Sequence, residues 1–134
     1  MEVRFRDCDL MGHVNNAAYF TYFEQARLVA ADTFGMRRAL EETGLSLILV
    51  HGACDYKAQL KFGDVVDVGV AVTAIGRSSF TLGYEVRRVQ DEAIVALGTS
   101  VQAIFDYEAQ KSVPIPETIR SKLEALVAGA PISS

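Results

Sequence analysis

The chain has 134 residues, a net charge of −4 and a 50% share of hydrophobic residues. This length and composition predict a single globular domain over residues 1–134 with a core of its own. The negative balance argues against a nucleic-acid-binding surface.

The cysteines and histidines are too few and too scattered to predict a metal site. Cys8, Cys54, His13 and His51 stand in no spacing typical of zinc ligands, so we expect no metal. The N-terminus has no apolar stretch of the kind that begins a secretory signal, and the two thiols either indicate a reducing compartment or carry no information on location. A cytoplasmic location is therefore the expectation.

The first 35 residues hold the most distinctive pattern. Val3 to Arg6 is predicted to be a short strand, and Asp7 to Val14 a polar loop. A helix capped by Asn15 or Asn16 then runs to about Phe34. This helix is apolar on most faces, which predicts that other parts of the chain wrap around it. It also carries enough polar residues to argue against a membrane span.

After a short second helix or a turn over Met36 to Thr43, the periodicity changes to that of strands. About four long strands are predicted; they cover an apolar stretch within 45–60 and the segments 66–72, 80–86 and 93–106. Pro116 begins a helix that continues to about Val127. The predicted fold class is α+β, a curved antiparallel sheet wrapped around the long helix. Apolar residues on the other face of the sheet point to self-association.

The segment Arg4 to Arg27 has the pattern R-x-R-D-C-D-x-x-G-H-V-N-N-x-x-Y-x-x-Y-x-E-x-A-R. This pattern resembles the opening motif of the hotdog-fold thioesterases of the 4-hydroxybenzoyl-CoA thioesterase type. Weaker matches of the same kind follow at residues 55–57, 62–64, 75–80, 84–86 and 114–116. The resemblance implies the hotdog fold, acyl-CoA thioesterase activity, and active sites formed at a dimer interface.

The resemblance also implies roles for two residues. Asp9 corresponds to the catalytic carboxylate, either as the nucleophile or as a general base for water. The backbone N–H of Asn16, in the first turn of the helix, corresponds to the group that polarises the thioester carbonyl. The alternative is that Asp9 only caps its loop. We interpret Asp7 as structural, accepting backbone N–H groups.

Two further residues near the motif have open interpretations. His13 either contacts substrate or holds the turn. Glu24 is paired, by Arg27 or by a partner subunit, or it lines the acyl pocket. Because other hotdog enzymes take their catalytic acid from the helix, Glu24 is the second candidate for the catalytic carboxylate.

Coenzyme A carries phosphates, so basic and hydroxyl groups near the pocket are expected. The candidates are Lys57, Lys61, Arg77, Lys111, Ser78 and Ser79, each of which is otherwise an ordinary surface residue. Tyr19, Phe20, Phe23 and His51 either line the acyl pocket or belong to the core.

The predicted reaction needs no cofactor, and the expected substrate is a thioester of coenzyme A or of acyl carrier protein. A homodimer or homotetramer is expected. Two alternatives stay open: a hotdog dehydratase acting on hydroxyacyl thioesters through His13 and Glu24, and a non-catalytic protein that binds acyl thioesters. The sequence does not identify the acyl group.

Overall fold

A computed structural model describes residues 1–128 and 132–133. After a 3₁₀ turn at Phe5–Asp7, the elements are α1 (Ala18–Thr33), α2 (Met36–Thr43), β1 (Ser46–Tyr56), β2 (Val66–Ile75), β3 (Ser79–Arg88), β4 (Ile94–Asp106), β5 (Lys111–Ser112), α3 (Glu117–Ala128) and β6 (Ile132–Ser133). No helix in this described part is long and apolar enough to cross a membrane.

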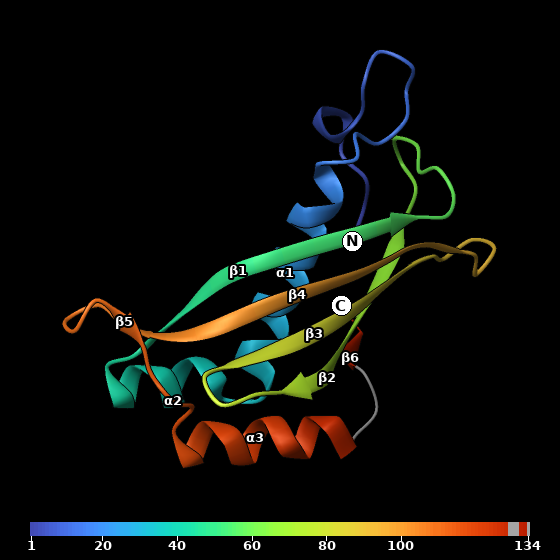
Figure 1. Cartoon of the computed structure of the whole chain (residues 1–134). Coiled ribbons are helices and arrows are strands. Elements are labelled where there is room, and N and C mark those ends of the chain that lie inside the picture. Colours follow the sequence, from blue (N-terminus) through green and yellow to red (C-terminus); the bar gives the residue numbers. More distant parts are fainter. Residues whose placement is uncertain (129–131, 134) are drawn as a thin grey trace.

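The strands form one antiparallel sheet in the order β1-β4-β3-β2-β6, with β5 beside β4. Figure 1 shows α1 lying against one face of this sheet, with α2 and α3 at one end and the loop before α1 at the other. The predicted α+β hotdog architecture and its four long strands are confirmed.

The predicted strand at Val3–Arg6 is wrong. The chain instead turns at Phe5–Asp7, because the Asp7 carboxylate accepts hydrogen bonds from the backbone and the side chain of Arg4 three residues earlier. A local hydrogen bond between a side chain and the backbone competes with strand formation. The preceding residues keep only an isolated bridge, between Glu2 and Val65.

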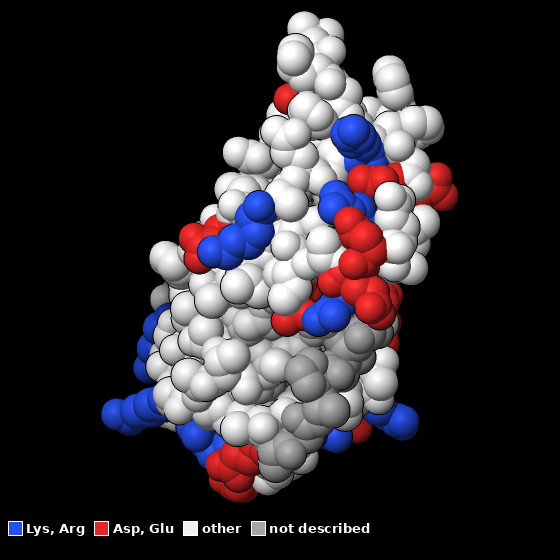
Figure 2. Space-filling view, turned by 90° about the vertical axis from the view of Figure 1, so that its right-hand side faces the viewer, with Lys and Arg blue, Asp and Glu red and all other residues white. Residues whose placement is uncertain are grey.

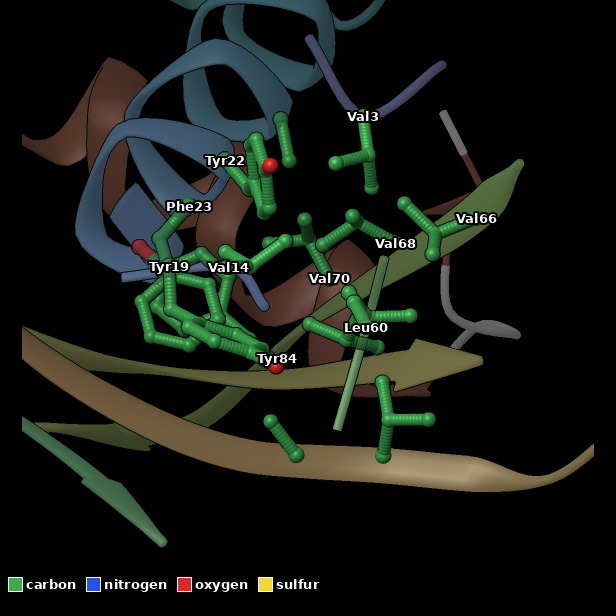
Figure 3. Packing of buried hydrophobic residues seen from close by; sticks show 14 residues of the cluster. Val3, Val14, Tyr19, Tyr22, Phe23, Leu60, Val66, Val68, Val70 and Tyr84 are labelled. Carbon is green, nitrogen blue, oxygen red and sulfur yellow. The ribbon is translucent and has the colours of Figure 1, made fainter. Parts of the chain in front are cut away.

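The core lies between α1 and the concave face of the sheet (Figure 3). Phe23 stacks on Tyr84, with ring centroids 4.5 Å apart. A glycine is required opposite this pair, because a Cβ atom at Gly98 would lie 2.4 Å from the Phe23 ring. Gly98 thus lets the helix approach the sheet closely.

The sheet covers only one side of α1. Tyr22, Phe23 and Ala26 are buried, whereas Leu28 and Val29 remain about half exposed. The expectation that the chain wraps most faces of the helix is therefore wrong for a single copy, because a sheet packs against one side only. The exposed helix side and the free edge of β1 leave apolar groups for another molecule to cover.

Candidate active site

The loop between Asp7 and Asn15 is a small hairpin closed by backbone contacts. Cys8 and Val14 form a β-bridge, and the N–H of Asn15 donates to the carbonyl of Asp7 at 2.6 Å. Gly12, with φ of 78°, takes the left-handed conformation at its tip. The hairpin therefore presents its tip at a fixed position relative to the start of α1.

Asp9 holds this hairpin with one of its two carboxylate oxygens. Its Oδ1 accepts from the N–H of Met11 at 2.9 Å and from the N–H of His13 at 3.3 Å. Within the described residues, Oδ2 has no hydrogen-bond partner, and the side chain is exposed. The capping role and a free carboxylate oxygen are thus both present in the same side chain.

The hairpin tip is apolar as well as exposed. Leu10 and Met11 at the tip, and Phe5 and Phe62 beside it, are all more than half exposed. On the face seen in Figure 2, this upper end of the molecule has few charged side chains. The hairpin tip that follows Asp9 therefore presents apolar side chains to the outside.

The start of α1 offers backbone donors to a ligand. The prediction that Asn15 or Asn16 caps the helix is wrong, because the N-cap residue is Ala17 and no side chain caps the helix. The side-chain oxygen of Asn15 instead accepts from the N–H of Ala17 at 2.9 Å and holds the turn before the helix. The carbonyl of Asn16 accepts from the Tyr56 hydroxyl at 3.0 Å, which ties the helix start to the end of β1. Among the described residues, no group accepts a hydrogen bond from the N–H of Asn16.

Asp7 is the buried carboxylate that joins the hairpin to the helix. It accepts from the N–H and guanidinium of Arg4 and from the Tyr22 hydroxyl at 2.9 Å. Burial opposes its ionisation, but the hydrogen bonds from Arg4 and Tyr22 and the charge of Arg4 outweigh burial, so the pKa of Asp7 lies below its ordinary value. Burial and the bond to Asp7 raise the pKa of Tyr22, which keeps its donor proton.

Three other predicted residues lie near this end of the molecule. Tyr19 belongs to the core: it is 2% exposed and packs edge-on against Tyr22 and Tyr56, while burial raises its pKa to about 12. His13 holds the turn through its backbone and bridges to Lys61. Lys57 is exposed directly after β1.

One group of the predicted phosphate-binding residues, Arg77, Ser78 and Ser79, lies at the opposite end of the sheet, whereas Lys57 and Lys61 lie at the Asp9 end. Arg77 and Ser78 occupy the turn before β3, and Ser79 begins that strand opposite Ala103, whereas Tyr56 at the helix start lies opposite Ala96. Seven residues of strand separate these levels, about 23 Å. One chain therefore does not bring this group to Asp9.

A second feature is a cavity of about 300 Å³ between the C-terminal half of α1 and the sheet. Its lining is apolar except for Glu24, Arg27 and Gln102. Glu24 is exposed and has no ion pair with Arg27 in the described part of the chain; the guanidinium of Arg27 donates instead to the Tyr84 hydroxyl at 3.1 Å. The sequence pattern does not identify Arg27 and Gln102 as lining residues. Of the two interpretations of Tyr19, Phe20, Phe23 and His51, lining the acyl pocket or belonging to the core, the first does not apply to this cavity, because none of the four lines it.

No group of three or more His, Cys, Asp or Glu side chains that could hold a metal ion occurs among the described residues.

A helix held against an antiparallel sheet, with a carboxylate hairpin before the helix, is the arrangement of a hotdog fold. A family profile described as the thioesterase-like superfamily matches residues 3–123, and the chain belongs to that superfamily. The expected enzyme class, thioester hydrolase, is confirmed.

Relatives across different bacteria are similar over nearly the whole chain. An acyl-CoA thioesterase, YbgC, of Haemophilus influenzae is 27% identical over a match that covers 94% of this chain and 93% of the relative's chain. A 1,4-dihydroxy-2-naphthoyl-CoA hydrolase of Synechococcus elongatus is 25% identical, with 91% and 90% covered. A thioesterase of Thermus thermophilus, solved with coenzyme A and Zn, is 32% identical with a TM-score of 0.81, covering 96% and 92%.

We expect Asp7→Asn to destabilise the protein by about 2 kcal/mol, because the charge-assisted hydrogen bonds to a buried carboxylate are lost. The stabilisation from ionised Asp7 is complete above its ordinary pKa of 3.8 and is lost as the pH falls through the lower pKa of the folded state. Urea unfolding at pH 7 and at several acidic values measures both effects. The exposed Asp67→Asn serves as the control; equal stability of the two variants at pH 7 would contradict the role of Asp7.

Proposed function

We propose that this protein is an acyl-CoA thioesterase of the 4-hydroxybenzoyl-CoA thioesterase type, which hydrolyses an acyl thioester to the free acid and coenzyme A. The observation that carries the proposal is that, among the described residues, neither Asp9 Oδ2 in the hairpin nor the N–H of Asn16 directly after the hairpin has a hydrogen-bond partner. Membership of the thioesterase-like superfamily, and relatives that act on acyl-CoA, support it.

The chemistry follows from these two groups. The N–H of Asn16, helped by the dipole at the helix start, stabilises the negative charge that develops on the thioester oxygen. Asp9 either attacks the carbonyl carbon to form an anhydride that water then opens, or removes a proton from water as the water attacks. In both routes the C–S bond breaks and the thiolate of coenzyme A leaves. Neither route uses a cofactor.

We propose that two chains form each complete site. β1 is an edge strand that pairs only with β4 among the described strands, and Leu49 and Val50 on it are 55% and 53% exposed. Antiparallel pairing of β1 with its copy would cover them and extend the sheet. A two-fold axis at this edge reverses one chain relative to the other.

In this arrangement the distant basic turn is placed to bind coenzyme A at the site of the other copy. The turn at Arg77, Ser78 and Ser79 of one copy would approach the Asp9 end of the other copy. A guanidinium and two hydroxyls there suit the phosphates and pantetheine of coenzyme A, and Lys57 is available on the Asp9 side. A phosphopantetheine arm on acyl carrier protein shares this chemistry. The minimum assembly is a homodimer, with a homotetramer as the alternative.

The other enzyme interpretation gains no support. A dehydratase needs a histidine facing a carboxylate, and in the described part of one chain the His13 imidazole has no hydrogen bond or ion pair with Glu24.

Cys8 and Cys54 are both free thiols, which supports our proposal of a reducing, cytoplasmic location.

Asp9→Asn separates the catalytic role of Asp9 from its capping role. The amide oxygen still accepts from Met11 and His13, so the hairpin is kept while the nucleophile or base is lost. We expect kcat to fall by at least about 100-fold with substrate binding retained. Thiol release from short-chain, long-chain and aromatic acyl-CoAs measures it, with Asp67→Asn as the control. Full activity in Asp9→Asn would leave Asp9 as a cap only, and Glu24→Gln would then be tested.

Asn16→Pro tests the backbone donor. Proline removes the N–H but is tolerated at the start of a helix, so we expect a loss of about 100-fold in kcat with little loss of stability. Asn16→Ala, which keeps the N–H, should stay close to the wild-type rate. The same thiol-release assay compares them, and equal rates for both variants would remove Asn16 from the mechanism.

The dimer is tested at the β1 edge. Val50→Lys places a charge in the proposed interface and should convert the dimer to a monomer with loss of activity. Val89→Lys is the matched control, since Val89 is 48% exposed but lies in the β3–β4 turn. Sedimentation velocity measures the assembly. A wild-type protein that is active while sedimenting as a monomer would contradict the proposal.

A further inference from the structure

A chain of hydrogen bonds crosses the apolar core beside the cavity. The Arg27 guanidinium donates to the Tyr84 hydroxyl at 3.1 Å, and the Tyr84 hydroxyl lies 2.6 Å from Ser100 Oγ. Gln102 Nε2 donates to the same Ser100 oxygen at 2.5 Å. Tyr84, Ser100 and Gln102 are all at most 3% exposed. The network therefore joins Arg27 on α1 to Gln102 on β4 through two buried hydroxyl groups.

This network of hydrogen bonds ends in a polar atom that has no partner. Gln102 Oε1 is the one buried side-chain oxygen or nitrogen among the described residues that has no hydrogen-bond partner. Rotating the amide by half a turn exchanges its oxygen and nitrogen but still leaves one polar end without a partner. A buried acceptor or donor of this kind is costly unless something binds it.

A hydroxyl group fits both amide orientations. It donates to Oε1 in one and accepts from the NH₂ group in the other. Gln102 and Arg27 both line the cavity, whose remaining lining is apolar except for Glu24. The cavity thus suits an aliphatic chain that carries a hydroxyl group.

The distance from the start of α1 sets the length of this ligand. Arg27 lies nine residues beyond Ala18, about 13 Å along the helix. Gln102 lies six residues along β4 from Ala96, the strand partner of Tyr56, about 20 Å. At about 1.2 Å per bond, an extended acyl chain of roughly ten to sixteen carbons covers this distance. A hydroxybenzoyl group, with about five bonds from carbonyl carbon to hydroxyl, is too short.

We infer that the cavity is a specificity subsite for the far end of the acyl chain, and that Gln102 selects medium- to long-chain acyl groups carrying a hydroxyl near that end. This inference rests on the proposed thioesterase function, since it assigns the substrate class of that reaction. Gln102 makes no contact with the reacting thioester in this assignment. It acts by hydrogen bonding to the distal hydroxyl.

The test compares wild type with Gln102→Met, which keeps the side-chain length and removes both polar atoms. Leu82→Met, in the same cavity, is the matched control. The probes are ω-hydroxy fatty acids of about eight to sixteen carbons and the unsubstituted acids of the same lengths. Calorimetry measures binding of the free acids, and thiol release measures kcat/KM for their coenzyme A thioesters. Urea unfolding checks that both variants are folded.

For each protein the quantity compared is the ratio of the hydroxy compound to the unsubstituted compound, in binding affinity and in kcat/KM. We expect this ratio to be about tenfold higher in wild type and Leu82→Met than in Gln102→Met, and to be greatest at one chain length. The same preference in Gln102→Met as in wild type would overturn the inference, as would no preference at any length because a water satisfies Gln102. If no thioester is hydrolysed, the proposed function fails, and the binding of the free acids still decides whether the subsite exists.

Discussion

The buried carboxylate of Asp7 is the interaction on which the rest of the site depends. A carboxylate in this position would be strongly unfavourable alone, but Arg4 and Tyr22 both donate to it. Arg4 belongs to the N-terminal segment and Tyr22 to the second turn of α1, so one side chain joins two parts of the chain. The hairpin that presents Asp9 begins directly after this junction, and its position follows from it.

The second constraint is the incomplete cover of α1. The sheet buries Phe23 so closely that Gly98 is required opposite it, yet Leu28 and Val29 on the same helix remain exposed. A sheet of this curvature reaches only one side of a helix. Asp9 and the basic turn at Arg77 are also far apart in a single chain. The association along β1 that we propose would cover the apolar surface and bring these two groups together.

The sequence predicted the elements where one strong local pattern controls them. Strict alternation defines β2 and β3, and the first motif defines the polar loop and the helix. The strand expected at Val3–Arg6 failed because the Arg4–Asp7 hydrogen bonds are stronger than the strand preference of so short a segment. The cavity was missed because its lining comes from elements far apart in the sequence. A signal did exist: Ser100 and Gln102 are polar residues at inward-facing positions of an otherwise apolar strand.

The stability of the fold does not by itself explain the hydrogen-bond network from Arg27 to Gln102. Well-packed apolar residues in place of buried polar ones are often as stable or more so, and a buried acceptor without a partner costs about 1–3 kcal/mol. Within the described residues this fold satisfies its other buried side-chain polar atoms and leaves only Gln102 Oε1 unmet. Local inconsistencies of this kind are expected where a protein contacts its ligand. Because this one lines a cavity of molecular size, its missing partner belongs to what the cavity binds.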